Sequence, residues 1–373
     1  MSRTHILGSR LLQPPTQPST TFGTSPITPH KARNGVRSIT CRNRHCPQCQ
    51  TRAKEARIAA RGRELLPVPY FHLVFTLPHV LNPLVATSPR RLYELLFRAV
   101  SATLLEFAAD PRHLGGTPAF TLVLHTWTQE LARHPHLHAL VAGGALTDTG
   151  GWVSPRRSFL FPVKALSKVF RGKFVAALKQ EYTQGRFAPP PGRSSLDGAA
   201  WQALLTSLYR HDWVVYAKPA PGGPAQVLDY LARYTNKVAI SNHRITGLAD
   251  GMVSFRVRDP QRPKAGRITS LPAPEFIRRF LLHVLPAGFK RIRHYGLQAS
   301  RHKAAKLGLC RTLLDMPAPQ LAVRESVADF MARVAQADIT RCSKCANGRL
   351  QFVAALAPLR PAFSPRLATG PPA

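Results

Sequence analysis

Three histidines alternate along an apolar stretch of the chain, HPHLHALVAGG. Successive side chains of an extended strand point to opposite faces, so His134, His136 and His138 are expected on one face, with Leu137 and Ala139 on the other. Neutral imidazole is the most frequent metal ligand in proteins, and the pair His136 and His138 is therefore predicted to hold a metal ion. A polar edge strand without a metal would show the same pattern, so the rest of the sequence has to decide.

Two tyrosines four residues apart, Tyr230 and Tyr234, form a second group of reactive side chains within DYLARYTNK. Residues at this spacing lie one turn apart on one face of a helix, so both phenols could reach the same point. A phenol can attack a phosphodiester when a metal ion neutralises the phosphate oxygens. Core packing of two aromatic rings gives the same spacing. The cationic side chains nearby are expected to contact DNA phosphates: Arg233, Lys237, His243 and Arg244.

The overall charge indicates a polyanionic partner. Fifty-two Lys and Arg residues against 18 Asp and Glu residues give a net charge of +34 at pH 7. An enzyme of small neutral metabolites does not need a surface that repels itself so strongly, whereas DNA would neutralise it. The sequence has neither an apolar run of transmembrane length nor the apolar core of a signal peptide. We therefore expect a globular, cytoplasmic protein with no membrane partner, and the sequence identifies no protein partner.

The histidines and tyrosines must be positioned by a mixed set of elements. Apolar and β-branched runs predict strands, and apolar residues at helical spacing predict helices. The alternation of the two, with a hairpin that carries the histidines, predicts an α+β fold in which helices pack on an antiparallel sheet. The predicted strands are 70–81, 119–129, 136–146 and a strand, turn and strand over 238–259; the predicted helices are 51–66, 89–110, 163–182, 226–239 and 273–286.

Five of the six cysteines fall in two tight clusters, which in a reducing compartment favours metal binding over disulfides. Cys41, Cys46 and Cys49 have the spacing of ligands to a structural zinc ion. Such a site needs four ligands, and His30 or His45 could supply the fourth. The second cluster is a lone CxxC at residues 342–345, for which a reduced structural role is an equal alternative. The sixth, at position 310, is expected to be a buried thiol.

Several strings together resemble one known family, the two-tyrosine rolling-circle transposases of IS91-type insertion sequences, within the HUH superfamily of single-strand nucleases. They are HPHLHALVAGG, YLARYTNKVAISNHRI, CRNRHCPQCQ and FHLVFTLPHVLNPL. The resemblance runs from about Ser38 to Arg349. It implies an HUH-endonuclease-like antiparallel sheet with flanking helices, preceded by a small, incomplete zinc-binding module, in a bacterial, nucleoid-associated protein. The expected parts are a disordered or non-matching segment (1–37), the zinc-binding-like module with a basic helix (38–62), the catalytic domain (63–310), a region with the CxxC (311–350) and a disordered tail (351–373).

The resemblance also implies a mechanism of single-strand cleavage and rejoining. One tyrosine attacks a phosphodiester at the transposon end, becomes linked to the 5′ phosphate and releases a 3′ hydroxyl, and the second tyrosine serves another strand. Mg²⁺ or Mn²⁺ is the expected ion at the histidines, and Zn²⁺ is possible at the cysteines. A third protein ligand is usual in the superfamily: Gln129 and His125 are the candidates, and His134 and His72 are less favoured. The expected partners are single-stranded transposon ends and target DNA.

Two other functions fit part of the sequence. A DNA-binding protein without catalysis, or an inactive transposase copy, would explain the charge and the cysteine cluster. A replication initiator or conjugative relaxase of the same superfamily would share the chemistry. The simultaneous presence of the His-x-His and Tyr-x3-Tyr motifs favours catalysis over binding alone, and the cysteine cluster with YLARYTNKVAIS favours a transposase.

Overall fold

The structure is a computed structural model. It describes residues 55–56, 58–156, 160–188, 197–220, 226–227, 239–259, 266–317, 325–342, 345 and 347–350. The predicted zinc ligands, both tyrosines, the helix over 226–239 and the predicted disordered ends therefore lie outside the described residues, apart from the two ends of that helix. Within the described part of the chain, no helix is long and apolar enough to cross a membrane.

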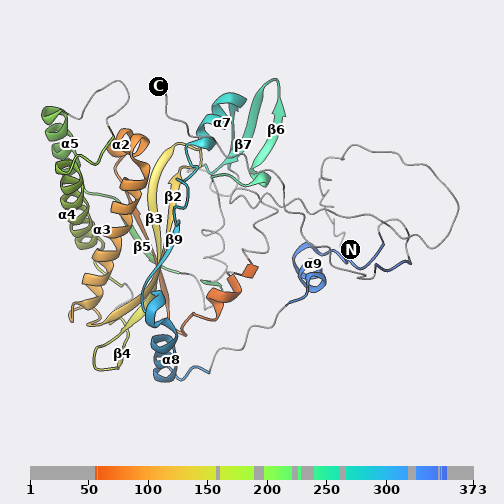
Figure 1. Ribbon diagram of the computed structural model, residues 1–373, viewed down its shortest axis with the longest axis horizontal. Coiled ribbons are helices and arrows are strands. Elements are labelled where there is room, and N and C mark those ends of the chain that lie inside the picture. The colour runs from red at the N-terminus through yellow and green to blue at the C-terminus, as the bar shows by residue number, and fades with distance from the viewer. Residues whose placement is uncertain are drawn as a thin grey trace, which may run out of the picture. The chain divides into compact units, whose positions relative to one another are not determined.

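The centre of the fold is an antiparallel sheet in the order β5-β1-β3-β2-β9, with β4 paired to β3 (Figure 1). β2 and β3 are the long hairpin strands, and both are nearly continuous in buried residues. The mixed α+β architecture with an antiparallel sheet is the one predicted from the sequence. The strands are β1 (Tyr70–Thr76), β2 (Thr117–Trp127), β3 (Arg133–Leu146), β4 (Trp152–Val153), β5 (Val215–Pro219) and β9 (Ile292–Gly296).

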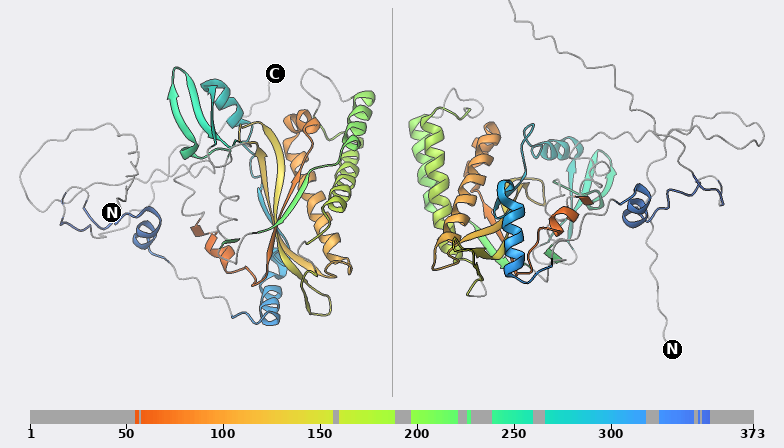
Figure 2. Two further views of the ribbon diagram at one scale, coloured as in Figure 1. Left: turned by 180° about the vertical axis from the view of Figure 1, so that it is seen from behind. Right: turned by 60° about the horizontal axis from the view of Figure 1, so that its bottom comes forward.

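One face of this sheet is covered by α3 (Pro89–Ala109) and α4 (Val163–Thr183), as Figures 1 and 2 show. Every second side chain of β3 points into this layer, and Leu137 and Phe170 are fully buried there in one continuous apolar core. Burying a side chain of this size stabilises the fold by about 1.5–3 kcal/mol, so the core fixes which face the histidines must occupy. Three shorter helices border the same layer: η1 (His79–Leu81), α2 (Asn82–Thr87) and α5 (Gly198–Arg210).

A second core lies on the opposite face, at the end of the sheet next to α8 (Lys303–Leu313) (Figure 2). Leu307 of that helix packs there with Leu140 of β3. Gly296 ends β9 with a φ of 60°, and a Cβ atom at this position would overlap the carbonyl oxygen of Pro118 on β2. Only glycine therefore allows the two strands to pair so closely. η3 (Ser300–His302) links β9 to α8.

A small three-stranded sheet extends from the other end of the large one (Figure 1). It is attached through the turn between β2 and β3, where Arg267 forms an ion pair with Glu130 and Arg279 donates to the Glu130 carbonyl at 3.2 Å. The order is β6-β7-β8, and the elements are η2 (Asn242–Arg244), β6 (Ile245–Ala249), β7 (Met252–Val257), β8 (Arg267–Pro272) and α7 (Ala273–Leu281); α9 (Val327–Ala335) follows later in the chain.

The predicted strands and the predicted helices over 89–110, 163–182 and 273–286 are observed, with differences at their ends. The helix predicted over 51–66 is helical at 55–56 and 58–62, and the one predicted over 226–239 lies outside the described residues apart from its two ends. The strand expected over 70–81 ends at Thr76 because Pro78 lacks the N–H that a ladder needs, and a short 3-10 helix follows. The helix expected over 273–286 ends at Leu281, before Pro286. β5, β8 and β9 are strands that the sequence analysis does not predict.

Candidate metal centre

The histidines of β3 lie on one face of the sheet, as the alternation predicts. Leu137 and Ala139 are fully buried on the helix-covered face, while His134, His136 and His138 are each only partly buried. The sheet face that carries the imidazoles is therefore the one that α3 and α4 leave uncovered. This part of the sequence analysis is confirmed.

His125 of β2 completes a group of three imidazoles. The antiparallel register places His125 directly opposite His136, so both side chains leave the sheet on the same face. One ring nitrogen each from His125, His136 and His138 lies within 4.8 Å of the other two. The ring centroids of His125 and His138 are 4.5 Å apart, and those of His136 and His138 are 4.9 Å apart. Three donors from two adjacent rigid strands can point at one ion without any rearrangement of the backbone.

The ring of His136 is oriented by its own strand. Its Nδ1 lies 2.7 Å from the carbonyl oxygen of His134, and a carbonyl can only accept, so Nδ1 carries the proton and donates. Nε2 is left with its lone pair, as metal-bound histidines require. Burial lowers the pKa of His136 to about 4, because a charged imidazolium would lose its water there. The ring is therefore neutral at pH 7 and ready to bind a cation.

His138 is held from the neighbouring strand. Its Nδ1 shares a hydrogen bond of 2.8 Å with Nε2 of His72 on β1, and the two rings stack with an interplanar angle of 10°. His72 is buried, and burial together with the positive charge of Lys218 lowers its pKa to about 4. With Nδ1 of His138 engaged in this bond, an ion would have to be bound through Nε2.

A cavity of about 300 Å³ opens beside this group and includes His125 and His136 in its lining. Trp127 stacks on His125 at a centroid distance of 4.6 Å and fixes that ring. Ala239 and Arg244 line the opposite side of the cavity. Ala239 is buried with a φ of 49°, a left-handed backbone that costs a non-glycine residue energy and is concentrated at functional sites.

Gln129 also lines the cavity, but its side chain is engaged elsewhere. Its Oε1 accepts from the backbone N–H of Arg258 at 2.6 Å, and its carbonyl accepts from the guanidinium of Arg244. Of the two candidates that the sequence offers for the third ligand, His125 lies with the two β3 histidines in one cluster, while the Oε1 of Gln129 is held by the Arg258 N–H. His125 is placed there by the pairing register of β2 with β3, which cannot be read from the sequence.

The predicted phosphate contacts fall into two groups. His243 is exposed, and its Nε2 lies 3.2 Å from the hydroxyl of Ser241. Arg244 is half-buried and donates through Nε to the carbonyl of Arg256 at 2.7 Å as well as to Gln129. One donor of this guanidinium thus contacts β7 of the small sheet and another contacts the β2–β3 turn, so the side chain links the two. Arg233 and Lys237 lie outside the described residues.

The two tyrosines are outside the described residues as well, but the chain on their C-terminal side is placed. Ala239, five residues after Tyr234, lines the cavity next to His125 and His136. Five residues span at most about 18 Å when fully extended. The covalent chain therefore tethers Tyr234 to the wall of the cavity that contains the imidazoles.

Known protein families match two parts of the chain. A family model described as "Putative transposase" matches residues 119–306, which include the three imidazoles and both tyrosines. A model described as "Transposase zinc-binding domain", of the IS91 type, matches residues 29–77, which include the three N-terminal cysteines. The second match begins before residue 38, where the sequence analysis placed the start of the zinc-binding module.

Among curated proteins, the chain is similar to "Putative transposase y4qJ" of Sinorhizobium fredii, with 41% identity over 83% of this chain and 79% of that protein. It is also similar to the transposase for insertion sequence element IS801 of Pseudomonas savastanoi pv. phaseolicola, with 27% identity over 86% of this chain and 76% of the relative. Both relatives are aligned over most of their length, so the similarity extends well beyond the short motifs.

Solved structures with some similarity include the conjugative relaxase TrwC complexed with a 27-mer DNA, at 12% identity and a TM-score of 0.24, covering 66% of this chain and 74% of that chain. A metal-bound structure of the same relaxase in complex with oriT DNA gives 14% identity and a TM-score of 0.24 over 67% of this chain and 73% of that chain. TM-scores of this size are too low to bear on the function.

Proposed function

Because the chain belongs to the IS91-type two-tyrosine transposases, we propose that it cleaves and rejoins single-stranded DNA at one site built from the imidazole cluster and the tyrosine segment. The observation that carries the proposal is the convergence of one ring nitrogen each from His125, His136 and His138 within 4.8 Å, on the sheet face opposite α3 and α4. A protein that only binds DNA has no use for three imidazoles whose ring nitrogens converge beside a cavity.

The imidazole cluster fits a divalent cation. Three nitrogen donors are present, and the pKa of His136 keeps that ring uncharged down to about pH 4. A bound divalent ion would neutralise the non-bridging oxygens of a phosphodiester and hold the phosphorus for in-line attack. Imidazole nitrogen is a softer ligand than carboxylate oxygen, so the donor set favours Mn²⁺ over Mg²⁺. We assign the three ligands to His125, His136 and His138, with Gln129 as part of the cavity wall.

Tyr230 and Tyr234 are the proposed nucleophiles. The oxygen of one phenol forms a bond to the phosphorus and the bond from the phosphorus to the 3′ oxygen breaks. The phenol proton passes to water, and the 3′ oxygen takes up a proton from water. The products are a tyrosine linked to the 5′ phosphate and a strand with a free 3′ hydroxyl. The bond energy is retained, so that 3′ hydroxyl or another can reverse the reaction without ATP. A second tyrosine allows a second strand to be held while the first is still attached.

The cysteines belong to a separate module in this proposal. Cys41, Cys46 and Cys49 lie within the match to the transposase zinc-binding domain, and thiolates at this spacing suit a structural zinc ion. We propose that they hold Zn²⁺, with a histidine as the fourth ligand. This site would stabilise the N-terminal region and would have no part in cleavage.

The experiment that tests the proposal is the formation of a covalent adduct with single-stranded DNA that contains the ends of the element. Full-length protein should form the adduct in Mn²⁺ and lose it in a chelator. His136→Ala should form none while still binding the DNA, because the basic surface supplies most of the affinity. His211→Ala, at an exposed residue that follows α5, is the matched control and should behave as wild type. Adduct formation by His136→Ala at the wild-type rate would remove the metal site from the mechanism.

A further inference from the structure

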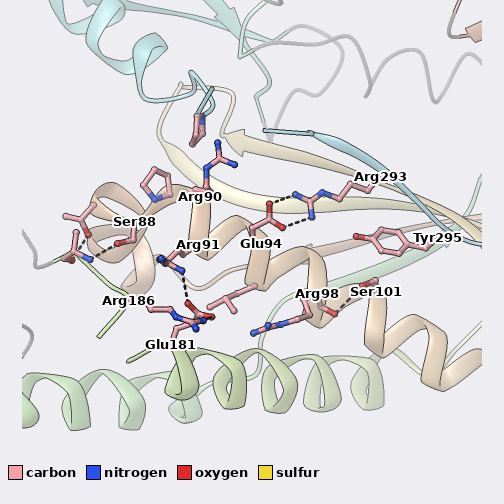
Figure 3. Close-up of a pocket in the computed structure, with 15 residues that line it drawn as sticks. Ser88, Arg90, Arg91, Glu94, Arg98, Ser101, Glu181, Arg186, Arg293 and Tyr295 are labelled. Atoms are coloured by element: carbon pink, nitrogen blue, oxygen red, sulfur yellow. Dashed lines mark hydrogen bonds and ion pairs between the residues drawn. The ribbon is translucent and has the colours of Figure 1, made fainter. Parts of the chain in front are cut away.

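An arginine-rich hollow lies on the sheet face opposite the imidazoles. It is a cavity of about 810 Å³ between α3, α4 and β9 (Figure 3). Arg293 and Tyr295 of β9 point into the cavity. His294 lies between them and points to the imidazole face, where its Nδ1 is 2.9 Å from the hydroxyl oxygen of Thr121. The five arginines that line the cavity are Arg90, Arg91, Arg98, Arg186 and Arg293.

Two glutamates in the wall neutralise only part of this charge. Glu94 pairs with Arg293 through two bonds of 2.6 and 2.7 Å, and this hydrogen bonding lowers the pKa of Glu94. Glu181 is buried and pairs with both Arg91 and Arg186, at 3.2 and 3.1 Å. These pairs hold three of the guanidinium groups in fixed positions and leave a net positive cavity.

Arg98 has no carboxylate partner among the described residues. Its side chain extends from α3 toward α4 in Figure 3, and the hydrogen bond drawn there is donated by the Ser101 hydroxyl to the backbone carbonyl of Arg98, not to its guanidinium. Arg90 donates only to the carbonyl of Ala287 and also keeps its charge unpaired within the described chain. Each free guanidinium offers a planar fork that matches two phosphate oxygens.

The hollow continues beyond Arg98. A second cavity of about 460 Å³ between α3 and α4 shares Arg98 and adds Lys173 and Ala102 to the wall. From Arg91 to Ala102 the exposed side of α3 runs for about 16 Å at 1.5 Å per residue. A single phosphate ion would fill a small part of this length, whereas a nucleic acid strand presents phosphates at intervals along it.

We propose that the groove between α3 and α4 is a second binding track for the phosphate backbone of single-stranded DNA, away from the imidazoles. Arg98 and Arg90 contact phosphates, and the partly exposed ring of Pro89 in the same wall contacts a sugar or base. The inference rests on the proposed function for the identity of the polyanion. The imidazole cluster and this groove lie on opposite faces of the sheet, so a DNA strand that binds both must pass around the edge of the sheet. The groove therefore adds affinity for long DNA and none for a short cleavage substrate.

The test compares two charge reversals in the full-length protein, Arg98→Glu and Arg301→Glu. Arg301 is exposed on η3 and lines neither cavity, so it controls for the change in net charge. For an oligonucleotide of about 40 nucleotides that includes the cleavage site, Arg98→Glu should bind about tenfold more weakly than Arg301→Glu, with a salt dependence reduced by about one phosphate contact. For an oligonucleotide of about 12 nucleotides the two variants should bind and be cleaved equally.

Each outcome decides one question. Equal binding of the long DNA by both variants, when wild type binds and cleaves it, overturns the track and leaves the proposed function intact. A loss in Arg98→Glu that is the same for short and long DNA also overturns it, because the residue would then act at the cleavage site or on folding. If a mononucleotide binds more weakly to Arg98→Glu than to Arg301→Glu, while both variants bind long DNA equally, the groove is a site for small anions and not for a DNA strand. If wild type neither binds nor cleaves DNA, the proposed function fails first.

Discussion

Acid should destabilise the folded chain through histidines that the fold keeps neutral. Burial holds the pKa of His72, His136 and His294 at about 4, whereas an unfolded chain protonates histidine near pH 6.5. Below pH 6.5 the unfolded state thus binds more protons than the folded state, and the free energy of unfolding falls as the pH drops toward 4. The stabilising contribution of the three histidines is complete above pH 6.5 and is lost as the pH falls from 6.5 to 4.

The size of the effect follows from the two pKa values. Lowering the pH from 7 to 5 costs about 2 kcal/mol for each histidine that is protonated only in the unfolded state. The three together should lower the free energy of unfolding by about 6 kcal/mol, which is a large part of the stability of a typical domain. The carboxylates with low pKa, such as Asp110 and Glu275 at about 2, contribute their losses at lower pH.

Urea unfolding in a chelator, followed by tryptophan fluorescence at pH 7 and pH 5, measures this loss. All four tryptophans lie in the part of the chain that carries the sheet, at positions 127, 152, 201 and 213. His294→Gln should lose about 2 kcal/mol less than wild type between the two pH values, and His302→Gln, at an exposed position on η3, should lose the same as wild type. A His294→Gln variant with the full wild-type pH dependence would refute the reasoning.

Three further predictions concern the sites. His125→Ala should abolish Mn²⁺-dependent nicking, whereas Gln129→Ala should retain most of it, as measured on labelled single-stranded DNA; the reverse order would move the third ligand to Gln129. The double variant Tyr230→Phe with Tyr234→Phe should fold normally and form no covalent adduct, while each single variant still cleaves once but fails in strand transfer; an adduct with the double variant would require another nucleophile. Purified protein should contain about one equivalent of zinc, and Cys46→Ser should release it without loss of nicking, as measured by elemental analysis and the nicking assay.

The sequence was sufficient for the parts of the site that depend on local pattern. Strand alternation placed His136 and His138 on one face, because moving Leu137 out of the core would expose an apolar side chain that the fold buries completely. The hairpin of β2 and β3 followed from two apolar runs separated by a short turn. These predictions depend on neighbours within one or two residues, which the sequence displays directly.

Features that depend on register or on distant segments could not be predicted. His125 and Gln129 lie four residues apart on one segment, and it is the pairing of His125 with His136, with the irregularity before Trp127, that places His125 in the imidazole cluster. The arginine-lined groove is assembled from α3, α4 and β9, whose contributions are up to about 200 residues apart in the chain. No periodicity connects Arg98 with Arg293.

The covalent adduct itself gives the most direct test of the central claim. Trypsin cleaves after Arg233, between the two tyrosines, so Tyr230 and Tyr234 fall in different peptides. Wild-type protein incubated with single-stranded transposon ends and Mn²⁺, then digested with trypsin and nuclease, should yield a nucleotide attached through its 5′ phosphate to one or both of these peptides. A nucleotide found on any other peptide, or the absence of any adduct while the DNA is still cleaved, would contradict a two-tyrosine mechanism at the imidazole cluster.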